Sequence, residues 1–413
     1  MLKNYLLTAY KVFMRRKLFT AINLLCIVLT LVVLMVVTAM LENAFFPSGV
    51  EGKSDRFLQV MVLRMESADG HNISSSPLGY KLIDKYLKPL KSVELVGATV
   101  MPSTVSVYKD GRVTELQMRR ADANYWKILD FTLLSGRLPT QDDDEHGRLV
   151  AVLNQTSARN LFGANEAVGN TVSVGGQHLT VIGVVQDELH LNAFADLWAP
   201  ITSMPSTAYR NEIRGDFIAL LLAKSAADIP QIQNEVKLIA RTVQLDDPKT
   251  YARALFWADK KLDVFARLTI GDADKEDSGA AKLLTVLLTL MLLFMLLPAL
   301  NLVNLNTGRI LERSSEIGVR KAFGATSTQL VWQLITENVL LCLAGGALGL
   351  LCATGVLVWL EGSGLIPYMK VHMNFAIMGY GLLITLVFGL LSGALPAWKM
   401  SRLDPVHALK GAI

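Results

Sequence analysis

Residues 18 to 40 read LFTAINLLCIVLTLVVLMVVTAM, a run of 23 residues that contains no charged side chain. A helix rises about 1.5 Å per residue, so a run of this length crosses the roughly 30 Å hydrocarbon core of a bilayer. The alternative is a cleaved signal peptide, but its apolar region has about 7 to 15 residues. No clear small-x-small cleavage site follows this run either. We therefore expect a first membrane span at 18–40.

The composition of the whole chain points to the same class of protein. Of its 413 residues, 52% are hydrophobic and only 18% are charged, which is too apolar for an ordinary soluble enzyme. The formal net charge of +4 is too small for this length to argue for nucleic acid as a partner. All three cysteines lie in long apolar runs, so we expect no disulfide or zinc site in the polar middle of the chain.

Three further apolar runs occur toward the C-terminal end, at about 281–306, 334–360 and 375–398. With the first run they predict an α-helical membrane protein with four transmembrane helices. The roughly 240 residues at 41–280 contain no other segment that is long and apolar enough to span. We therefore expect that this part of the chain folds as an aqueous domain.

Basic residues beside the spans predict the orientation, because Lys and Arg are retained on the cytoplasmic side of short loops. They cluster before the first span, between the second and third spans, and in the tail, whereas the loop at 361–374 has only Lys370. Both termini are therefore expected in the cytoplasm, with the large domain on the opposite side. The residues that carry this argument are Lys11, Arg15, Arg16, Lys17, Arg309, Arg313, Arg320, Lys321, Lys399, Arg402 and Lys410.

The third and fourth spans are rich in small residues, which let helix backbones approach closely inside a bilayer. We predict that Gly345, Gly346, Gly349, Gly389 and Gly393 form helix-packing or dimer faces. The alternative is that glycine is simply common in membrane helices. In the second span, Pro298 removes a backbone hydrogen bond, so a kink or a break is expected there.

The domain at 41–280 has an α+β pattern. A strand is expected at 56–65, a helix at about 77–90, and a hairpin whose turn is Asp110-Gly111. A second strand–helix pair is expected at 215–224 and 229–243. We predict two subdomains: an outer β-α-β subdomain at about 51–120 and 196–270, and an inserted one at about 121–195. The acidic run at 142–145 lacks the spacing of a calcium loop and is expected to be a solvated loop.

The sequence lacks the common catalytic patterns. There is no phosphate-binding loop, no His-Glu-x-x-His helix and no Gly-x-Ser-x-Gly elbow. The six histidines are scattered without metal-ligand spacing, and we interpret them as surface or loop residues. The spans carry essentially no ionisable residue, and Glu337 is placed at a membrane edge, so an ion-coupled transporter is not expected. No catalytic, cofactor-binding or metal-binding residue is predicted.

The segment between the second and third spans is the most informative part of the chain. From Asn301 it reads NLVNLNTGRILERSSEIGVRKAFGAT. Glu312, Glu316 and Arg320 are four residues apart and share one polar helical face, while Ile317 and Phe323 offer apolar contacts. Gly324 is expected to end the helix. From these residues alone, a solvated helix and a docking helix are both open.

This segment resembles the permeases of the MacB/FtsX superfamily of ABC transporters, in which an Arg-x-x-Glu-Ile-Gly-x-Arg-Lys/Arg-Ala-x-Gly-Ala pattern follows the second span. Arg313 to Ala325 matches that pattern almost throughout. Within 41–280 the chain also resembles the ordered landmarks of a MacB-type periplasmic domain, and the tail resembles the family's C-terminal signature. These landmarks are Ser135-Gly136-Arg137, Val150 to Leu153, Asn160 to Gly163, Val168 to Thr171, Val181 to Val184, Pro396 to Trp398 and Asp404 to Leu409.

The resemblance implies a multi-pass protein of the bacterial inner membrane with a periplasmic domain. The predicted order is a cytoplasmic amphipathic segment (1–17), span one (18–40), the periplasmic domain (41–280), span two (281–306), a cytoplasmic coupling segment (307–333), span three (334–360), a short periplasmic loop (361–374), span four (375–398) and a cytoplasmic tail (399–413). Family members work as permease dimers with cytoplasmic ATPase domains, so the resemblance implies a second permease, either the same chain or a related one. The lipid bilayer is the surrounding partner, and no nucleic acid is expected.

The resemblance further implies that the coupling segment docks on an ATPase. The residues that match the docking region are Glu312, Arg313, Glu316, Ile317, Gly318, Arg320, Lys321, Phe323 and Gly324. MacB itself carries its ATPase at the N-terminus of the same chain, whereas here about 17 residues precede span one. We therefore expect a separate ATPase subunit that binds ATP and Mg, and a non-catalytic permease that binds neither.

Four functions remain open at this stage. The first is a permease of a MacB-like tripartite efflux or export system, with a periplasmic adaptor and an outer-membrane channel as partners. A lipoprotein-releasing permease has a similar topology, but its coupling segment usually lacks the Glu-Ile-Gly-x-Arg-Lys form. An FtsX-type regulator of a cell-wall hydrolase generally has a much smaller outer domain. A membrane-anchored sensor that recruits no ATPase is the alternative outside this family.

Overall fold

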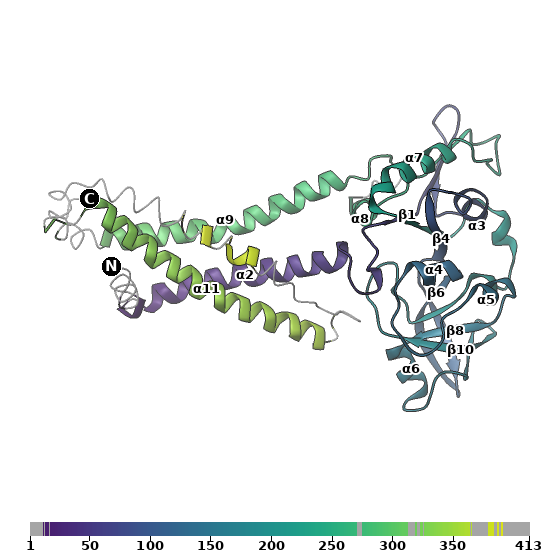
Figure 1. Cartoon of the computed structure of the whole chain (residues 1–413), viewed down its shortest axis with the longest axis horizontal. Coiled ribbons are helices and arrows are strands. Elements are labelled where there is room, and N and C mark those ends of the chain that lie inside the picture. The colour runs from purple at the N-terminus through teal and green to yellow at the C-terminus, as the bar shows by residue number, and fades with distance from the viewer. Residues whose placement is uncertain are drawn as a thin grey trace. The chain divides into compact units, whose positions relative to one another are not determined.

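The computed structural model describes residues 11, 13–15, 17–270, 275–312, 319, 323–324, 326–363, 365, 379–383, 386–387 and 390 (Figure 1). It divides into two compact units. The sheet unit is formed mainly by Asn43–Leu284, and the helix unit is formed by the chain before and after it.

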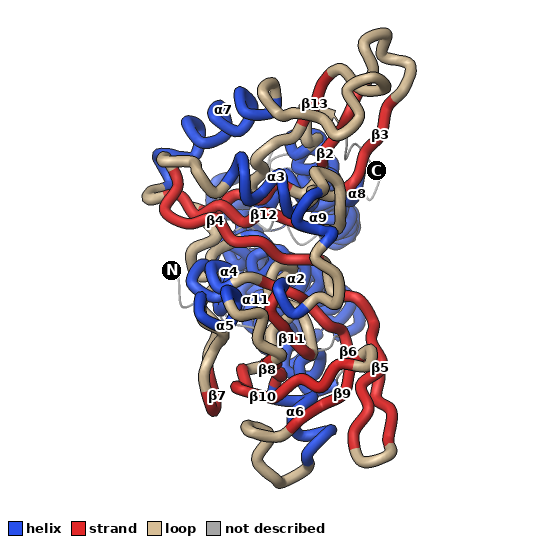
Figure 2. The backbone as a smooth tube through the Cα atoms, turned by 90° about the vertical axis from the view of Figure 1, so that its right-hand side faces the viewer, coloured by secondary structure: helices blue, strands red, loops and turns tan. Residues whose placement is uncertain are grey.

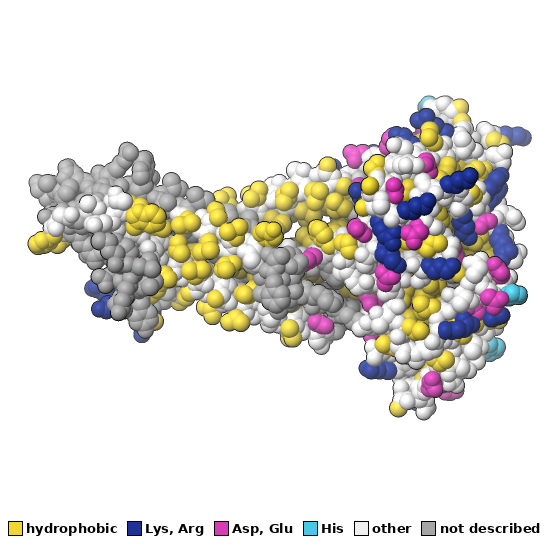
Figure 3. All heavy atoms as spheres, viewed as in Figure 1, with side chains coloured by type: hydrophobic (Ala, Val, Ile, Leu, Met, Phe, Trp, Pro, Cys, Tyr) yellow, Lys and Arg dark blue, Asp and Glu magenta, His cyan; other side chains and the backbone are white. Residues whose placement is uncertain are grey.

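The helix unit is built from three long helices, α2 (Lys17–Phe45), α9 (Ala280–Glu312) and α11 (Ser327–Ser363). Two stretches, Thr20–Glu42 and Val331–Ser363, are long and apolar enough to cross a membrane, and Ala280–Phe294 is a shorter apolar stretch. Hydrophobic side chains cover much of the visible face of these helices (Figure 3). Most of the predicted fourth span lies outside the described residues, of which Gly379–Leu383 are helical.

The strands of the sheet unit are β1 (Phe57–Val60), β2 (Leu63–Glu66), β3 (Ile73–Ser76), β4 (Val93–Val100), β5 (Ser103–Lys109), β6 (Arg112–Ala121), β7 (Leu133–Gly136), β8 (Val150–Asn154), β9 (Thr171–Val174), β10 (Gln177–Val185), β11 (Leu197–Pro200), β12 (Phe217–Ala223) and β13 (Arg253–Leu255). Its helices are α3 (Tyr80–Leu82), which continues as a π-helical turn at Ile83–Leu87, α4 (Ala123–Ile128), α5 (Gln141–Glu145), α6 (Gln155–Phe162), α7 (Ile229–Ala240) and α8 (Lys261–Ile270). Short 3₁₀ turns lie at Gly49–Glu51, Ile201–Ser203, Ala208–Asn211 and Ala226–Asp228.

Six strands of the sheet unit close on themselves. The pairing runs β6, β11, β8, β10, β9 and β5, and β5 pairs with β6 again, which completes a small barrel. Figure 2 shows β5, β6, β9 and β10 side by side. Closure leaves few exposed strand edges, and the interior is filled by side chains such as Val107, Leu153, Leu179 and Leu197.

The other part of the sheet is open and antiparallel, with the order β1, β12, β4 and the end of β6. The central strand β12 reads FIALLLA, and every residue in it is buried, as expected for a strand that is covered on both faces. Ala219 and Leu221 face a core that includes α7, whereas Leu220 and Leu222 face a second core that includes α4. The predicted pair at 215–224 and 229–243 is confirmed as β12 and α7.

The hairpin predicted at Asp110-Gly111 is confirmed, because Lys109 pairs with Arg112 and both turn residues have positive φ, 47° and 73°. Its strands β5 and β6 belong to the barrel together with β8 to β11. The predicted boundary between the outer and inserted subdomains near residue 120 therefore separates β5 from β9, although these two strands pair with each other. The barrel and the open sheet share β6 and so belong to one continuous sheet, although their buried side chains form separate clusters.

Two local predictions were wrong. The stretch 56–65 is not one strand, because β1 ends at Val60 and β2 joins a different sheet with β3 and β13. The acidic run at 142–145 is not a solvated loop but part of α5, in which Asp143 and Asp144 are buried. Thr140 and Asp143 form a capping box that opens this helix, and Arg137 binds both oxygens of the Asp143 carboxylate.

Candidate functional site

Three segments that are distant in sequence meet in the sheet unit and form what we call the junction cluster. They are the residues directly after α2, the loop 186–196 between β10 and β11, and the first residue of α8. The cluster consists of Ser48, Glu51, Glu188, His190, Asn192 and Lys261. α2 leads into the first of these segments, and α8 is followed along the chain by α9.

The centre of the junction cluster is a buried ion pair. Lys261 Nζ lies 2.5 Å from Glu51 Oε2, and the two side chains are 7% and 0% exposed. The other carboxylate oxygen of Glu51 accepts hydrogen bonds from the backbone N–H and the side-chain amide of Asn192, at 3.1 and 3.0 Å. Each charge is removed from water, so each depends on the other and on these hydrogen bonds for compensation.

The loop 186–196 is held by two residues with large buried side chains. Arg119 on β6 donates from Nε to the Phe194 carbonyl at 3.2 Å and from Nη2 to the Leu191 carbonyl at 3.0 Å. Tyr125 on α4 donates its hydroxyl to the Asn192 carbonyl at 2.7 Å. Burial lowers the pKa of Arg119 and raises the pKa of Tyr125 to about 12. The loop is therefore fixed to the sheet through its backbone carbonyls.

A second chain of hydrogen bonds links the segment after α2 to the same loop. Ser48 Oγ lies 3.1 Å from His190 Nε2, and His190 Nδ1 lies 3.2 Å from Glu188 Oε2. The connectivity is that of a serine–histidine–acid relay. The histidine and glutamate side chains are only 8% and 10% exposed, however, so we interpret the chain as a structural tie. The prediction that His190 lies in a loop is confirmed, but its side chain is buried.

The junction cluster ties together three segments that are distant in the chain. One ion pair joins the exit of α2 to α8, and the loop that completes it is anchored on β6 and α4. Close-packed interiors with satisfied polar groups move as discrete bodies rather than deforming continuously. The segment after α2, the start of α8 and the β10–β11 loop are therefore parts of one closely tied cluster.

Family models match most of the chain. The model described as "MacB-like periplasmic core domain" matches residues 20–239, and the one described as "FtsX-like permease C-terminal" matches residues 288–405. The first covers more than half of the chain. The chain belongs to the MacB/FtsX family of ABC transporter permeases. Five of the six residues of the junction cluster therefore lie within the part that matches a MacB-like periplasmic domain of α+β fold, and Lys261 follows it in the chain.

Individual relatives agree with this family. The chain is 24% identical over 328 residues to the uncharacterized ABC transporter permease YknZ of Bacillus subtilis, covering 79% of this permease and 77% of YknZ. It is 26% identical over 289 residues to the macrolide export ATP-binding/permease protein MacB of Chromobacterium violaceum, covering 69% of this permease and 42% of MacB. The permease thus spans less than half the length of that MacB.

Solved structures of two relatives are similar to part of this chain. The extracellular domain of YknZ aligns with a TM-score of 0.38 at 18% identity, covering 48% of this permease and 98% of that chain. The periplasmic region of MacB from Actinobacillus actinomycetemcomitans aligns with a TM-score of 0.38 at 17% identity, covering 55% and 97%.

The predicted ATPase-coupling residues of the permease are only partly described. Glu312 is the last residue of α9, Phe323 is 88% exposed, and Gly324 has a φ of 89°, the left-handed conformation that ends helices. An apolar side chain this exposed is available for a partner surface. The other predicted residues lie outside the described part, namely Arg313, Glu316, Ile317, Gly318, Arg320 and Lys321. The coupling assignment stays a prediction.

The predicted helix-packing glycines lie on the face of α11 that contacts α2. A Cβ atom added at Gly345 would lie 2.7 Å from Ile27 Cγ2, and one at Gly349 would lie 3.0 Å from Leu31 Cβ. Gly349 follows Gly345 by four residues on α11, and Leu31 follows Ile27 by four residues on α2, so the two helices run parallel here. A Cβ atom at Gly346 would lie 2.6 Å from Leu382. Gly389 and Gly393 lie outside the described residues.

The helix unit also shows the surroundings of Pro298 and of the polar residues in its long helices. α9 continues through Pro298 without a break, and a kink there stays a prediction. Glu337, which was placed at a membrane edge, is only 4% exposed, and Gln333 donates to its Oε1 at 3.2 Å. Asn23 on α2 is fully buried as well. Asn23 on α2 and Glu337 on α11 are thus buried, as are Gly345 and Gly349 on α11.

Sequence reasoning did not find the junction cluster. Glu51 and Asn192 are 141 residues apart, and no local pattern marks either of them. The only available signal was position, since Glu51 lies six residues after the end of α2 and Lys261 begins α8, the helix before α9. Among the described residues, no group of three His, Cys, Asp or Glu side chains is arranged to hold a metal ion.

Proposed function

We propose that this permease transmits ATP-driven conformational change from a separate cytoplasmic ATPase subunit to its periplasmic domain. The observation that carries the proposal is the buried Glu51–Lys261 ion pair, because it joins the chain segments that connect the domain to α2 and α9. A periplasmic domain attached by flexible linkers would not need a desolvated charge pair at its two attachment points.

The proposal includes a topology. Four spans place both termini in the cytoplasm, the domain in the periplasm, and the coupling segment on the side of the ATPase. The periplasmic domain consists of two subdomains, the open sheet with its flanking helices and the six-stranded barrel. The separate cores of these two parts support this division.

The partners follow from the same scheme. The ATPase subunit binds ATP and Mg and docks on the segment from Glu312 to Gly324. A second permease, either the same chain or a related one, completes the dimer. The likeness to MacB, whose name describes macrolide export, supports a tripartite export system with a periplasmic adaptor and an outer-membrane channel. The exposed aromatic side chain of Phe323 supports docking at this segment.

The test begins with purification of the full chain from its native membranes in a mild detergent, followed by mass spectrometry of the proteins that co-elute. We expect an ATPase subunit whose hydrolysis rate is stimulated by the permease. The variant Glu316→Ala with Arg320→Ala should lose most of that stimulation, because it removes two of the three charges from the predicted docking face, while its membrane insertion stays intact.

A matched control is Ser314→Ala with Ser315→Ala, which changes two neutral residues of the same segment and should leave stimulation unchanged. Full stimulation in the Glu316 and Arg320 variant would refute the coupling assignment. Recovery of no ATPase, under conditions that preserve other membrane complexes, would refute the transporter scheme and favour a membrane-anchored sensor.

A further inference from the structure

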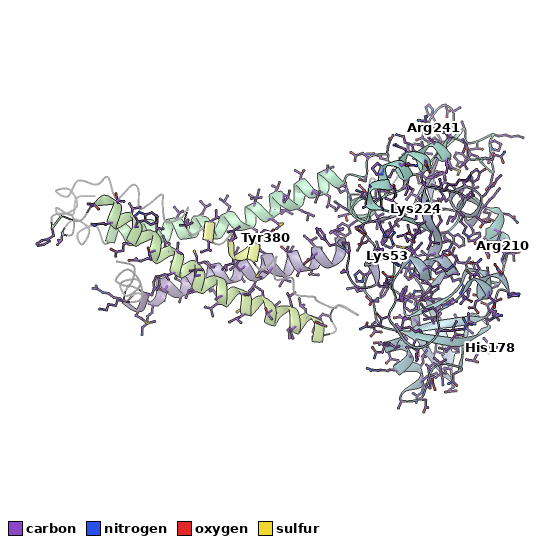
Figure 4. All side chains as sticks on the ribbon, in the orientation of Figure 1. Lys53, His178, Arg210, Lys224, Arg241 and Tyr380 are labelled. Atoms are coloured by element: carbon purple, nitrogen blue, oxygen red, sulfur yellow. The ribbon has the colours of Figure 1, made fainter. Side chains whose placement is uncertain are left out.

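A pocket of about 900 Å³ opens in the sheet unit, and none of the residues that line it belongs to the junction cluster. It lies between the start of β5, the end of β9 and the 3₁₀ turn Ala208–Asn211. Figure 4 labels Arg210, which lies on that turn but does not line the pocket. The volume is within the range of sites that hold organic ligands of drug size.

The walls of the pocket are largely apolar and adaptable. Met101, Met118 and Met204 line it, and Tyr209 and Phe217 add aromatic rings whose centroids are 5.7 Å apart. Methionine side chains have three rotatable bonds and a polarizable sulfur, so they fit ligands of different shape. Met118 and Phe217 are only 4% and 3% exposed, whereas Met101 is 42% exposed, so a ligand in the pocket would bury further apolar surface chiefly at Met101.

One cation stands in this wall without an acidic partner. Arg120 on β6 donates from Nη1 to the Pro200 carbonyl at 3.4 Å and to Ser203 Oγ, and from Nη2 to Gln177 Oε1 at 3.4 Å. All three acceptors are neutral, and no carboxylate of the described residues lies within ion-pair distance of Arg120. A guanidinium has five N–H donors, so one on Nε and one on Nη2 remain free.

The charge is not lost through burial. Burial lowers the pKa of Arg120, with the Tyr209 hydroxyl acting in the opposite direction, but a guanidinium stays protonated in proteins. The other charged side chains that line the pocket, Glu212, Arg214 and Asp216, are exposed at its rim, where water screens them. Away from its rim, the pocket therefore carries one positive charge, that of Arg120, among largely apolar side chains.

We propose that this pocket binds an amphiphilic organic anion, with its apolar body against the methionines and its carboxylate on the two free N–H donors of Arg120. Adjacent donors on Nε and Nη2 match the spacing of carboxylate oxygens, which favours a bidentate contact. Only the role of this ligand as a transported or regulatory molecule rests on the proposed function. Binding itself requires neither the ATPase nor the junction cluster.

The test is photolabelling of the full chain in lipid nanodiscs, without ATPase, by 4-benzoylbenzoate. This water-soluble benzophenone carboxylate inserts readily beside sulfur, so peptide mass spectrometry should place the adduct on Met101, Met118 or Met204. The neutral amide, 4-benzoylbenzamide, should label about tenfold less, because it lacks the charge-assisted bonds. Decanoate should protect against labelling, and decyl phosphate tests whether a phosphate serves equally.

The variant Arg120→Met should lower labelling by the carboxylate about tenfold, to the level of the amide, whereas Arg120→Lys should restore part of it. Arg210→Met is the matched control and should have no effect. Ala208→Trp keeps Arg120 but fills the pocket, so it should abolish labelling by both probes. Equal labelling by the carboxylate and the amide, or adducts that persist at these methionines in Ala208→Trp, would overturn the proposal. So would the absence of any adduct in the unaltered chain.

Discussion

The junction cluster and the pocket each contain a cation that is largely removed from water, but the two cations are compensated differently. Lys261 is 7% exposed and pairs with Glu51, which in turn accepts two hydrogen bonds from Asn192. Arg120 has only neutral acceptors from its own chain. A cation paired with a buried carboxylate fixes the fold at one place, whereas a cation with only neutral acceptors leaves capacity for an anionic ligand.

The same contrast occurs between two adjacent acids of α5. Arg137 hydrogen-bonds to Asp143 and holds the pKa of that carboxyl well below its usual range. Asp144 has no cation within ion-pair distance among the described residues, and burial raises its pKa to about 6. Asp144 instead accepts a hydrogen bond from the Ala123 backbone N–H at 2.6 Å, at the start of α4.

The largest effect should come from breaking the compensated pair. Lys261→Met leaves the Glu51 carboxylate buried without its cation, so the free energy of unfolding should fall by about 3 to 5 kcal/mol. The measurement is urea unfolding of the full chain in nanodiscs, followed by the fluorescence of the buried tryptophans in the sheet unit. Lys260→Met is the control, because Lys260 is its exposed neighbour.

The double variant Glu51→Gln with Lys261→Met separates pairing from packing. It removes both charges and keeps side chains of similar size, so much of the lost stability should return. If Lys261→Met were no more destabilising than Lys260→Met, the ion pair would not be a stabilising link and the contrast with Arg120 would disappear.

A smaller and pH-dependent effect is expected at Asp144. Its folded pKa of about 6 exceeds the usual value of 3.8, so the folded state binds the proton more tightly than the unfolded state. Stability therefore falls as the pH rises from about 4 to about 6, and the cost is complete above that window. Asp144→Asn keeps an acceptor for the Ala123 N–H and should stabilise the domain by about 2 to 3 kcal/mol at pH 7.5.

This gain should vanish near pH 4, where the folded carboxyl is already neutral, and thermal unfolding at the two pH values measures it. Asp143→Asn is the opposing control: it breaks the bond to Arg137 and should destabilise at pH 7.5. A gain for Asp144→Asn that is the same at both pH values would contradict the raised pKa.

The parts of the fold that the sequence predicted correctly depend on neighbours in the chain. The Asp110-Gly111 hairpin was predictable because both residues tolerate positive φ, and β12 with α7 because an apolar run precedes an amphipathic segment with a proline in its first turn. The single strand at 56–65 failed because β2 pairs with β13, nearly two hundred residues later. Local propensity cannot choose between two distant sheets.

The acidic run shows where a local signal was available but not used. Thr140 stands three residues before Asp143, which is the spacing of a capping box, and this indicates a helix start rather than a loop. No comparable signal existed for Glu51, Lys261 or Arg120. Their roles depend on which groups the completed fold brings to them, and a single sequence does not contain that information.

The smallest of these effects is expected in the helix unit, where glycines of α11 let its backbone approach Ile27 and Leu31 of α2 closely. Gly345→Leu would force a side chain against Ile27, whose branched Cβ cannot turn away, and overpacking of this kind costs about 1 to 3 kcal/mol. Unfolding by sodium dodecyl sulfate in mixed micelles should therefore occur at a lower detergent fraction.

Gly355→Leu is the matched control on the same helix, because a Cβ atom there meets nothing within 4 Å. Both changes remove a glycine from α11 and add the same apolar side chain, so they share any effect of helix propensity and lipid partitioning. Only the Gly345 change should separate α2 from α11. Equal sensitivity of the two variants would mean that close approach at Gly345 does not hold the helices together, and that the buried polar residues Asn23 and Glu337 deserve the next substitutions.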